Sequence, residues 1–441
     1  MSGVNPASSR DWSFGPIPAD WRALPLKYLC TRSSLYGANV GAEIYESAGV
    51  RFLRTTDIRD DGTLNEGGVF LPAAIVVDYM LSEGDLLISR SGTVGRAYVY
   101  RLNDGPCAYA GYLVRYALRD RNTPRWLFHI TKTPGFQQWL GASAIEATIG
   151  NVNGEKYANL LVPVPPLPQQ RAIADYLDRE TTRLDALVAA KERLLELLAE
   201  KRRALITRAV TCGLDTRAPL CDADVASLDE IPAHWATNRL KFIAQISYGV
   251  GDELDKSLTS GVPLISLPNV DIEGLLHLEE LGWADLSESE KSPLLLRKGD
   301  LLFNWRNGSS AHVGKTAYFD AEGEFTHVGF LLRIRFDQSR YEPRFFQALL
   351  QTLRATGYFL YTRAMVNNTF NQTELGNLFV VVPTLAEQRA IVTYIATETV
   401  KLDAMRAATD RTIDLLKERR AALIAAAVTG QLDVTRNERH V

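Results

Sequence analysis

Apolar residues recur at helical spacing along a long stretch that occurs twice in the chain. The segment PPLPQQRAIADYLDRETTRLDAL from Pro165 returns as PTLAEQRAIVTYIATETVKLDAM from Pro383, and the segment from Glu200 returns from Glu418. One ungapped offset of 218 residues relates both pairs. Such a period is too long for a solenoid repeat. The pattern therefore indicates two copies of one large module.

Each repeated stretch has the pattern of a long amphipathic helix. Glycine and proline are absent from Gln169 to Cys212, and Gly213 supplies a stop signal. Because prolines disfavour helix in the residues before them, we expect the helix to begin after Pro168. Apolar residues follow a heptad spacing, with Leu177, Leu184, Leu198 and Leu205 at one position and Leu187 and Leu194 at the intermediate one, and Ile395, Leu402, Leu416, Leu423 and Met405 in the second copy.

A polar residue interrupts this stripe at matching positions of the two copies, Lys191 and Thr409. Such an interruption favours an antiparallel or heteromeric seam over a continuous parallel zipper. The stripe could instead pack against the body of the protein itself. We favour the two helices packing on each other, because each offers the same stripe and needs a partner for it.

Shorter matched blocks precede each long helix. Trp21 pairs with Trp235, and the GDLL turn at Gly84 returns at Gly299. Alternating apolar and basic residues from Gly111 and from Gly329 predict a strand. Pro124 and Pro343 open predicted short helices. Many short strands and few helices predict an α+β fold class, with two mixed α/β domains in a pseudo-two-fold repeat separated by the two long helices.

These matches give domain boundaries. We expect a loose N-terminal arm and a C-terminal tail, with each body leading into a long helix and a linker joining the copies. The predicted segments are 1–16 for the arm, 17–164 for the first body, 165–215 for the first long helix, 216–230 for the linker, 231–382 for the second body, 383–433 for the second long helix and 434–441 for the tail.

Composition narrows the class of protein only a little. The chain has 441 residues, a net charge of −3 and four scattered cysteines without a CxxC motif. These features indicate globular domains in a reduced, cytoplasmic setting. No secretory signal or membrane-length apolar run is present. The charge argues against a broadly basic nucleic-acid coat but allows a local basic cleft.

Motifs for catalysis are absent or broken. The segment GSSAHVGKT resembles a phosphate-binding P-loop, but Gly308 is one residue too far from Gly314, and a strand-like segment follows where a helix is needed. The six histidines show no zinc-binding spacing. Neither an Asn-Pro-Pro-aromatic motif for amino-methyl transfer nor a GxSxG elbow occurs. We therefore expect no enzyme activity and no metal on this chain.

Polar and basic loop residues are better candidates for function. Arginine and asparagine make bidentate contacts to guanine and adenine, and serine, threonine and lysine hold phosphates. For each residue alone, a solvated side chain or a turn cap is the simpler interpretation. The candidate DNA contacts are Arg90, Ser91, Thr93, Arg96, Asn151 and Asn153 in the first body, and Trp305, Arg306, Asn307, Ser309, Ser310, Lys315, Asn367, Asn368 and Asn371 in the second.

With these motifs in order, the chain resembles the specificity subunit of type I restriction–modification systems. The resemblance rests on a duplicated order: W-x4-L-K-[YF] at Trp21 and Trp235, GDLL at Gly84 and Gly299, and P-x-L-x-x-Q-R-x-I before each long helix. It implies two target-recognition domains that each read one half of a bipartite site in double-stranded DNA. It also implies antiparallel coiled-coil helices that set the spacer between the half-sites.

The resemblance further implies partner proteins. Two methyltransferase (modification) subunits would dock on the helices, and restriction subunits would join when present; no membrane is involved. We expect the subunit contacts at Gln170, Arg171, Leu177, Leu184, Gln388, Arg389, Ile395 and Leu402. The chain itself would carry no cofactor, with S-adenosylmethionine, ATP and magnesium on the partners. The alternatives are a P-loop NTPase with a coiled-coil arm and a purely structural coiled-coil scaffold.

Overall fold

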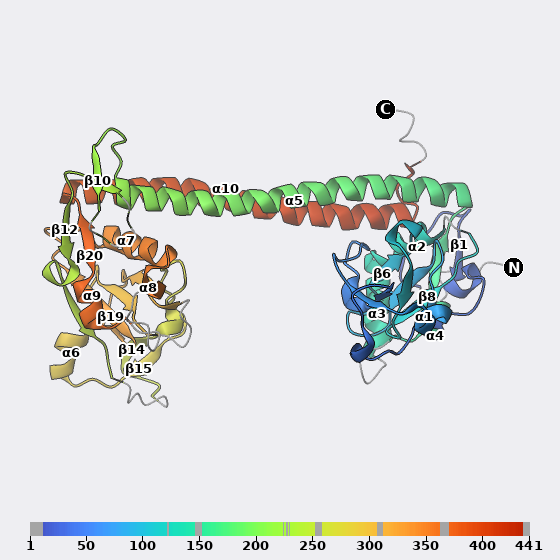
Figure 1. The fold of residues 1–441 in the computed structure, drawn as a ribbon, viewed down its shortest axis with the longest axis horizontal. Coiled ribbons are helices and arrows are strands. Elements are labelled where there is room, and N and C mark those ends of the chain that lie inside the picture. The colour runs from blue at the N-terminus through green and yellow to red at the C-terminus, as the bar shows by residue number, and fades with distance from the viewer. Residues whose placement is uncertain are drawn as a thin grey trace. The chain divides into compact units, whose positions relative to one another are not determined.

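The computed structural model describes residues 12–434 except 121–122, 146–151, 224, 226–227, 229, 252–257, 307–311 and 362–369. The chain forms two units. The first contains Met1–Glu192 with Asp410–Val441, and the second contains Arg193–Thr409. Each unit therefore combines one body with the first part of one long helix and the last part of the other (Figure 1).

The first body is built on two small sheets. One has the order β2-β8-β5-β6 and is antiparallel, and the other has the order β4-β3-β7 with β3 and β7 parallel. A third pairing, β1 with β9, closes the body at its two ends. The strands are β1 Arg22–Pro25, β2 Leu35–Tyr36, β3 Val50–Leu53, β4 Val69–Leu71, β5 Leu86–Ser89, β6 Ala97–Val99, β7 Cys107–Tyr109, β8 Leu113–Tyr116 and β9 Leu161–Val164.

The second body repeats this topology strand for strand. Its sheets have the orders β13-β19-β16-β17 and β15-β14-β18, and β12 pairs with β20. The strands are β12 Ala236–Arg239, β13 Ala244–Tyr248, β14 Val262–Ile265, β15 Gly282–Ala284, β16 Leu301–Asn304, β17 Thr316–Tyr318, β18 Thr326–His327, β19 Leu331–Phe336 and β20 Phe379–Val382. The α+β fold class and the duplicated bodies are confirmed.

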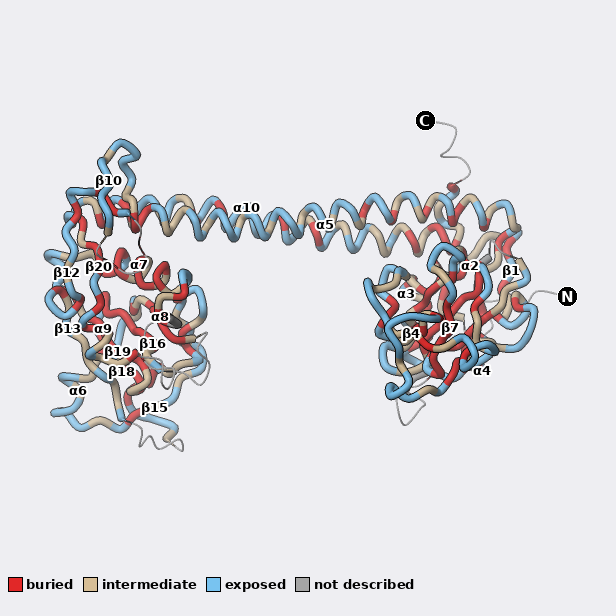
Figure 2. The backbone as a smooth tube through the Cα atoms, in the orientation of Figure 1, coloured by how far each residue is buried: buried red, intermediate tan, exposed pale blue. Residues whose placement is uncertain are grey.

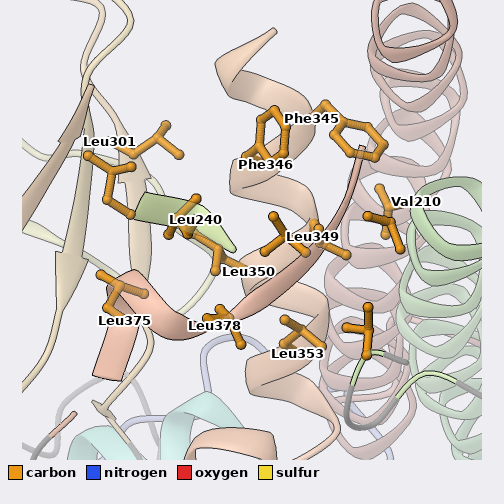
Figure 3. Packing of buried hydrophobic residues seen from close by; sticks show 14 of the residues in the cluster. Val210, Leu240, Leu301, Phe345, Phe346, Leu349, Leu350, Leu353, Leu375 and Leu378 are labelled. Carbon is orange, nitrogen blue, oxygen red and sulfur yellow. The ribbon is translucent and has the colours of Figure 1, made fainter. Parts of the chain in front are cut away.

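Short helices complete each body. In the first they are α1 Ala73–Val76, α2 Thr123–Thr131, α3 Pro134–Ile145 and α4 Gly154–Asn159. In the second they are α6 Glu288–Leu294, α7 Pro343–Ala355, α8 Tyr358–Tyr361 and α9 Gln372–Asn377. The helices α2 and α7 lie beside the long helices (Figure 1). Figure 3 shows Phe345 on the side of α7 that faces Val210 of a long helix, and both belong to one buried cluster.

The structure adds detail at two edges of the bodies. Of the expected arm, only residues 12–16 are described, and Phe14 among them is buried in the core of the first unit. The expected linker contains a strand, β10 Leu220–Asp222, which pairs with β11 Glu230–Pro232. Isolated apolar residues in polar segments carry little periodicity, so neither feature gave a pattern to detect.

The long helices are α5 Leu167–Cys212 and α10 Leu385–Val428. The first begins before the expected residue, with Pro168 inside its first turn, where a missing N–H costs nothing. Gly213 and Gly430 follow the helices with positive φ of 72° and 73°. Each glycine packs against the entry tryptophan of a body, Trp235 for Gly213 and Trp21 for Gly430.

Within each unit the two helix segments run antiparallel. In the first unit, Asp185 of α5 pairs with Arg420 of α10 at 2.8 Å. In the second unit, Arg202 of α5 pairs with Asp403 of α10. The repeat offset of 218 residues relates Asp185 to Asp403 and Arg202 to Arg420. The two ion pairs are therefore the same contact, made once in each unit.

The heptad expected on the long helices is confirmed at its first position and wrong at its intermediate one. Leu177 and Leu184 of α5, and Leu402 and Thr409 of α10, are buried at seven-residue spacing. Figure 2 shows buried residues alternating with exposed ones along both long helices. Leu187, Leu194 and Met405, assigned to the intermediate position, are 43%, 37% and 54% exposed. The second row of the seam in α5 instead consists of Thr181, Val188, Leu195, Arg202 and Ala209, all of them buried or half-buried.

Candidate nucleic-acid interface

The loop that follows β5 is held by the strand's last residue. Ser89 is fully buried, and its hydroxyl donates to the Thr93 carbonyl at 2.5 Å and accepts from the Arg96 amide at 2.9 Å. The Gly95 amide also donates to the Ser89 carbonyl. Gly92 has a positive φ of 72° at the tip, a conformation that favours glycine. The loop carrying Ser91 and Thr93 is thus a fixed, exposed bend.

Arg90 connects this loop to two other parts of the first body. Its amide donates to the Tyr112 carbonyl at 2.9 Å, and its carbonyl accepts from Val152 at 3.0 Å. The guanidinium lies 4.6 Å from the ring centroid of Tyr36, a stacking contact that orients it. The Tyr36 hydroxyl in turn accepts from the Gly154 amide, at the start of α4. The structure therefore brings Arg90, Ser91 and Thr93 together with Tyr36 and Tyr112.

The other first-body candidates have structural roles. Arg96 forms a 2.7 Å ion pair with Asp60. Asn153 caps α4, accepting from the Lys156 amide at 2.8 Å. The geometry of Asn153 therefore supports its interpretation as a turn cap. Asn151 lies outside the described residues.

The second body builds the same arrangement with different side chains. Trp305 takes the place of Arg90, because its carbonyl accepts from Phe370 at 2.7 Å, as that of Arg90 accepts from Val152. Its indole N–H donates to the Gly329 carbonyl at 2.7 Å. The Tyr248 ring meets the Trp305 ring edge-on at 5.4 Å, as Tyr36 meets Arg90. The side chain of Trp305 is therefore held by contacts within the second body.

Arg306 is the exposed cation of this second cluster. It stands one residue beyond Trp305, the equivalent of Arg90, so it corresponds to Ser91. Its guanidinium lies 5.7 Å from the centroid of the Phe330 ring. The two bodies therefore present their arginines from different positions of one scaffold.

Lys315 does not join this cluster. It is buried, and its ammonium donates to the Val270 carbonyl at 3.3 Å. Burial and the nearby Arg354 both lower the pKa of Lys315. The strand β17 begins at the next residue, Thr316, where a P-loop would open a helix. Its position therefore supports neither phosphate contact at the surface nor a nucleotide site.

The remaining second-body candidates divide into two groups. Asn371 caps α9, accepting from the amides of Thr373 and Glu374, while the Glu374 carboxylate accepts from the Asn371 amide. Its geometry again supports the turn-cap interpretation. Asn307, Ser309, Ser310, Asn367 and Asn368 lie outside the described residues.

Sequence reasoning missed the two tyrosines. A Tyr-Gly pair occurs at Tyr36 and again at Tyr248, within segments that otherwise differ. Each following glycine allows close contact between backbones, since a Cβ on Gly37 or Gly249 would lie within 2.2 Å of a carbonyl oxygen of β7 or β18. This repeated Tyr-Gly pair is the sequence signal that could have identified the two tyrosines.

The residues expected at subunit contacts are mostly used inside the chain. Gln170 is buried and donates to the Pro165 carbonyl, and Gln388 is buried and donates to the Pro383 carbonyl, both at 2.8 Å. Leu177, Leu184 and Leu402 are buried as well, and Ile395 is half-buried against the core. Only Arg171 and Arg389 are exposed among this set. The glutamines fix the start of each helix, so a partner would have to contact other side chains.

The described part of the chain offers no cluster of three or more His, Cys, Asp or Glu side chains that could hold a metal ion. Among the same residues, no helix combines the length and apolar character that crossing a membrane requires.

Comparison with known proteins gives consistent results. Residues 73–197 match the family model for the type I restriction modification DNA specificity domain. The type I restriction enzyme StySPI specificity subunit of Salmonella potsdam is 21% identical over 435 residues, which cover 95% of this chain and 90% of that protein.

Solved structures share the fold over nearly the whole length. A chain from a study of complex assembly and conformational transition of the type I R-M system has a TM-score of 0.70 at 19% identity, covering 94% of this chain and 99% of that one. The HsdS subunit of Thermoanaerobacter tengcongensis has a TM-score of 0.59 at 18% identity, covering 95% and 100%.

Proposed function

Since this chain belongs to the specificity-subunit family of type I restriction–modification systems, we propose that its two bodies read the two halves of a bipartite site in double-stranded DNA. Specificity subunits are the non-catalytic, DNA-recognising members of these complexes. The long helices would hold the two readers and set the length of the unread spacer.

One observation carries this proposal: the same loop cluster is built twice with different side chains. Tyr36 and Tyr248 brace equivalent loops, yet one loop presents Arg90 and the other presents Arg306 one residue further on. A bidentate arginine contact distinguishes guanine in the major groove. To read two different half-sites, two bodies with the same backbone arrangement need different side chains at their contact positions.

Methyltransferase subunits would dock on the exposed faces of the long helices. The predicted contact residues on the seam are occupied, whereas other large apolar residues of these helices face solvent. These are Leu187, Leu194 and Leu197 on α5, and Tyr394, Val400, Met405 and Leu415 on α10. S-adenosylmethionine would belong to those methyltransferase subunits, and ATP and magnesium to restriction subunits.

A selection experiment tests the proposal. The chain, together with its methyltransferase subunits, would be used to enrich a pool of randomised DNA duplexes by gel shift. We expect one bipartite motif with a spacer of fixed length. Enrichment of a continuous motif, or of none, would contradict the proposal and favour the purely structural scaffold.

A further inference from the structure

A cavity of about 490 Å³ opens in the first body, away from the candidate reading loop. It lies at the start of β5, next to Asp85, whereas Arg90 follows the other end of that strand. Its walls come from residues 31–32, 82–85 and 115–119. Small-molecule sites commonly have volumes of about 300–1,000 Å³. The cavity is therefore large enough for a ligand.

A buried arginine forms part of the wall. Arg115 is 5% exposed, pairs with Asp85 at 2.7 Å and donates to the Met80 carbonyl at 3.0 Å. Two carboxylates belong to the same lining. Asp85 is paired with Arg115, and Glu83 accepts from the Leu102 amide at 2.6 Å.

Two further arginines line the cavity, Arg32 and Arg119. Both are exposed, and no acidic side chain in the described part of the chain forms an ion pair with either. Arg119 uses its Nε to donate to the Cys30 carbonyl at 2.9 Å, which orients its guanidinium. Arginine suits bidentate contact with phosphate oxygens because its donors form a rigid planar fork.

The second body fills the corresponding space with its own side chain. Arg335 occupies the position equivalent to Ala117, and its guanidinium binds both carboxylate oxygens of Asp300, at 2.7 and 2.6 Å. Arg333, equivalent to Arg115, donates to the carbonyls of Pro293 and Leu295. In the first body the small Ala117 leaves that space open.

The two exposed arginines of the cavity also lack counterparts. Two more residues separate Thr31 from Leu35 than separate Gln245 from Ser247, and Arg32 lies in this insertion. The position equivalent to Arg119 is Asp337, of opposite charge. The first body therefore has both the open space and the added positive charge, and the second body has neither.

We propose that this cavity binds a phosphate group, held by Arg32 and Arg119 next to the buried Asp85–Arg115 pair. The phosphate could belong to a soluble phosphate monoester or to a DNA backbone, and the chemistry of the contact is the same. The site is separate from the reading loop, so its occupation does not depend on which sequence the chain recognises.

Titration calorimetry with inorganic phosphate tests this, with chloride at equal ionic strength as the reference. The wild-type chain should show one saturable site. Ala117→Arg copies the second body and should weaken binding at least about tenfold, as should Arg32→Gln, because each removes space or a charge-assisted hydrogen bond. Arg340→Gln changes an exposed arginine of the second body and should leave phosphate binding unchanged.

Absence of a saturable site in the wild-type chain would overturn the proposal, as would phosphate binding by both cavity variants that is as strong as that of the wild type. If the Ala117→Arg variant does not fold, the Arg32→Gln variant tests the proposal alone, since Arg32 is exposed and its loss removes no packing. Duplex DNA lacking the target site is then added as competitor. Displacement of phosphate by this DNA identifies the backbone as the source, and retention identifies a soluble phosphate; either result supports a phosphate site.

Discussion

At the scale of single residues, equivalent positions of the two bodies carry different chemistry on the same backbone. Ser89 uses its hydroxyl to hold the loop in the first body. Asn304, at the equivalent position, is buried, and its side-chain amide has no hydrogen-bond partner among the described residues. Arg90 is replaced by Trp305, and the exposed arginine moves to position 306. Substituting one such residue should therefore affect one half-site.

Arg306→Ala tests this at the second body. A bidentate arginine contact contributes about 1–3 kcal/mol of discrimination between bases, so affinity for the correct second half-site should fall by roughly ten- to a hundred-fold. Affinity for the first half-site should not change. Gel shifts with duplexes altered in either half measure both. Arg340→Ala, at an exposed site of the same body, is the control, and equal losses at both half-sites would assign Arg306 a folding role.

The start of α10 contains a pH-sensitive contact. Glu387 accepts hydrogen bonds from Thr384 and from the Trp235 indole, and its carboxylate lies 2.7 Å from His234 Nε2. Burial alone would raise the pKa of Glu387, but these partners hold it at about 2. In the first unit Gln169 accepts from Trp21 instead. The substitution Glu387→Gln therefore places the first copy's residue in the second.

Glu387→Gln should lower the free energy of unfolding by about 1 kcal/mol at pH 7, a value reduced for the partial exposure of the carboxylate. The folded pKa lies below the unfolded value of about 4.3. The charge therefore stabilises the chain above about pH 4.3, and its contribution disappears as the pH falls towards 2. Urea denaturation from pH 7 to pH 3 should show the difference between variant and wild type shrinking. If the difference in the free energy of unfolding does not change with pH, the shape of the Glu387 side chain, and not its charge, is what stabilises the chain.

At the scale of elements, the sequence identified the long helices and the first row of their heptad but misplaced the second row. Leucine occupies both position 194 and position 195, so leucine spacing alone did not show which of the two lies in the seam. Burial distinguishes them, because Leu194 is 37% exposed while Leu195 is half-buried.

The candidate site was predictable only in part. The loops after β5 and β16 followed from the GDLL blocks, and Arg90 and Arg306 were candidate contact residues because of their charge and loop position. The capping roles of Asn153 and Asn371 and the burial of Lys315 did not. Such roles depend on which backbone groups a side chain meets after folding, and local composition carries no record of that.

Leu184→Ala and Leu187→Ala test the two predicted positions of the heptad. Leu184 is 6% exposed, so its truncation should lower the free energy of unfolding by about 2–4 kcal/mol. Leu187 is 43% exposed, so its truncation should change stability by no more than about 0.5 kcal/mol, while weakening binding of the methyltransferase subunits. Chemical denaturation and a pull-down measure the two effects. Equal destabilisation by both variants would return Leu187 to the seam.

At the scale of the whole molecule, duplication separates two tasks. The repeated helices and their ion pairs, Asp185–Arg420 and Arg202–Asp403, are nearly the same in both copies. The bodies share strand order but differ in their exposed side chains. If the helices set the spacer, its length should change with helix length while both half-sites are kept.

Adding three heptads, about 21 residues, after Leu195 and at the matching position after Ile413 tests this. Each heptad returns the seam to the same face, and each helix lengthens by about 32 Å. This is close to one DNA turn of about 34–36 Å, so the spacer should lengthen by about nine or ten base pairs. Two heptads add about 21 Å, a little over half a turn, and should abolish methylation, because one reader would face the wrong side of the duplex. Unchanged spacing in a folded variant would show that the helices are not the ruler.

The most direct test of the account exchanges one body. Residues 17–164 would be replaced by the corresponding body of another specificity subunit, and the methylated sites would be mapped across the genome of cells that carry the hybrid and its methyltransferase subunits. We predict that one half of the methylated motif changes, while the other half and the spacer length stay the same. A change in both halves, or a motif without two halves, would contradict the claim that the two bodies are independent readers.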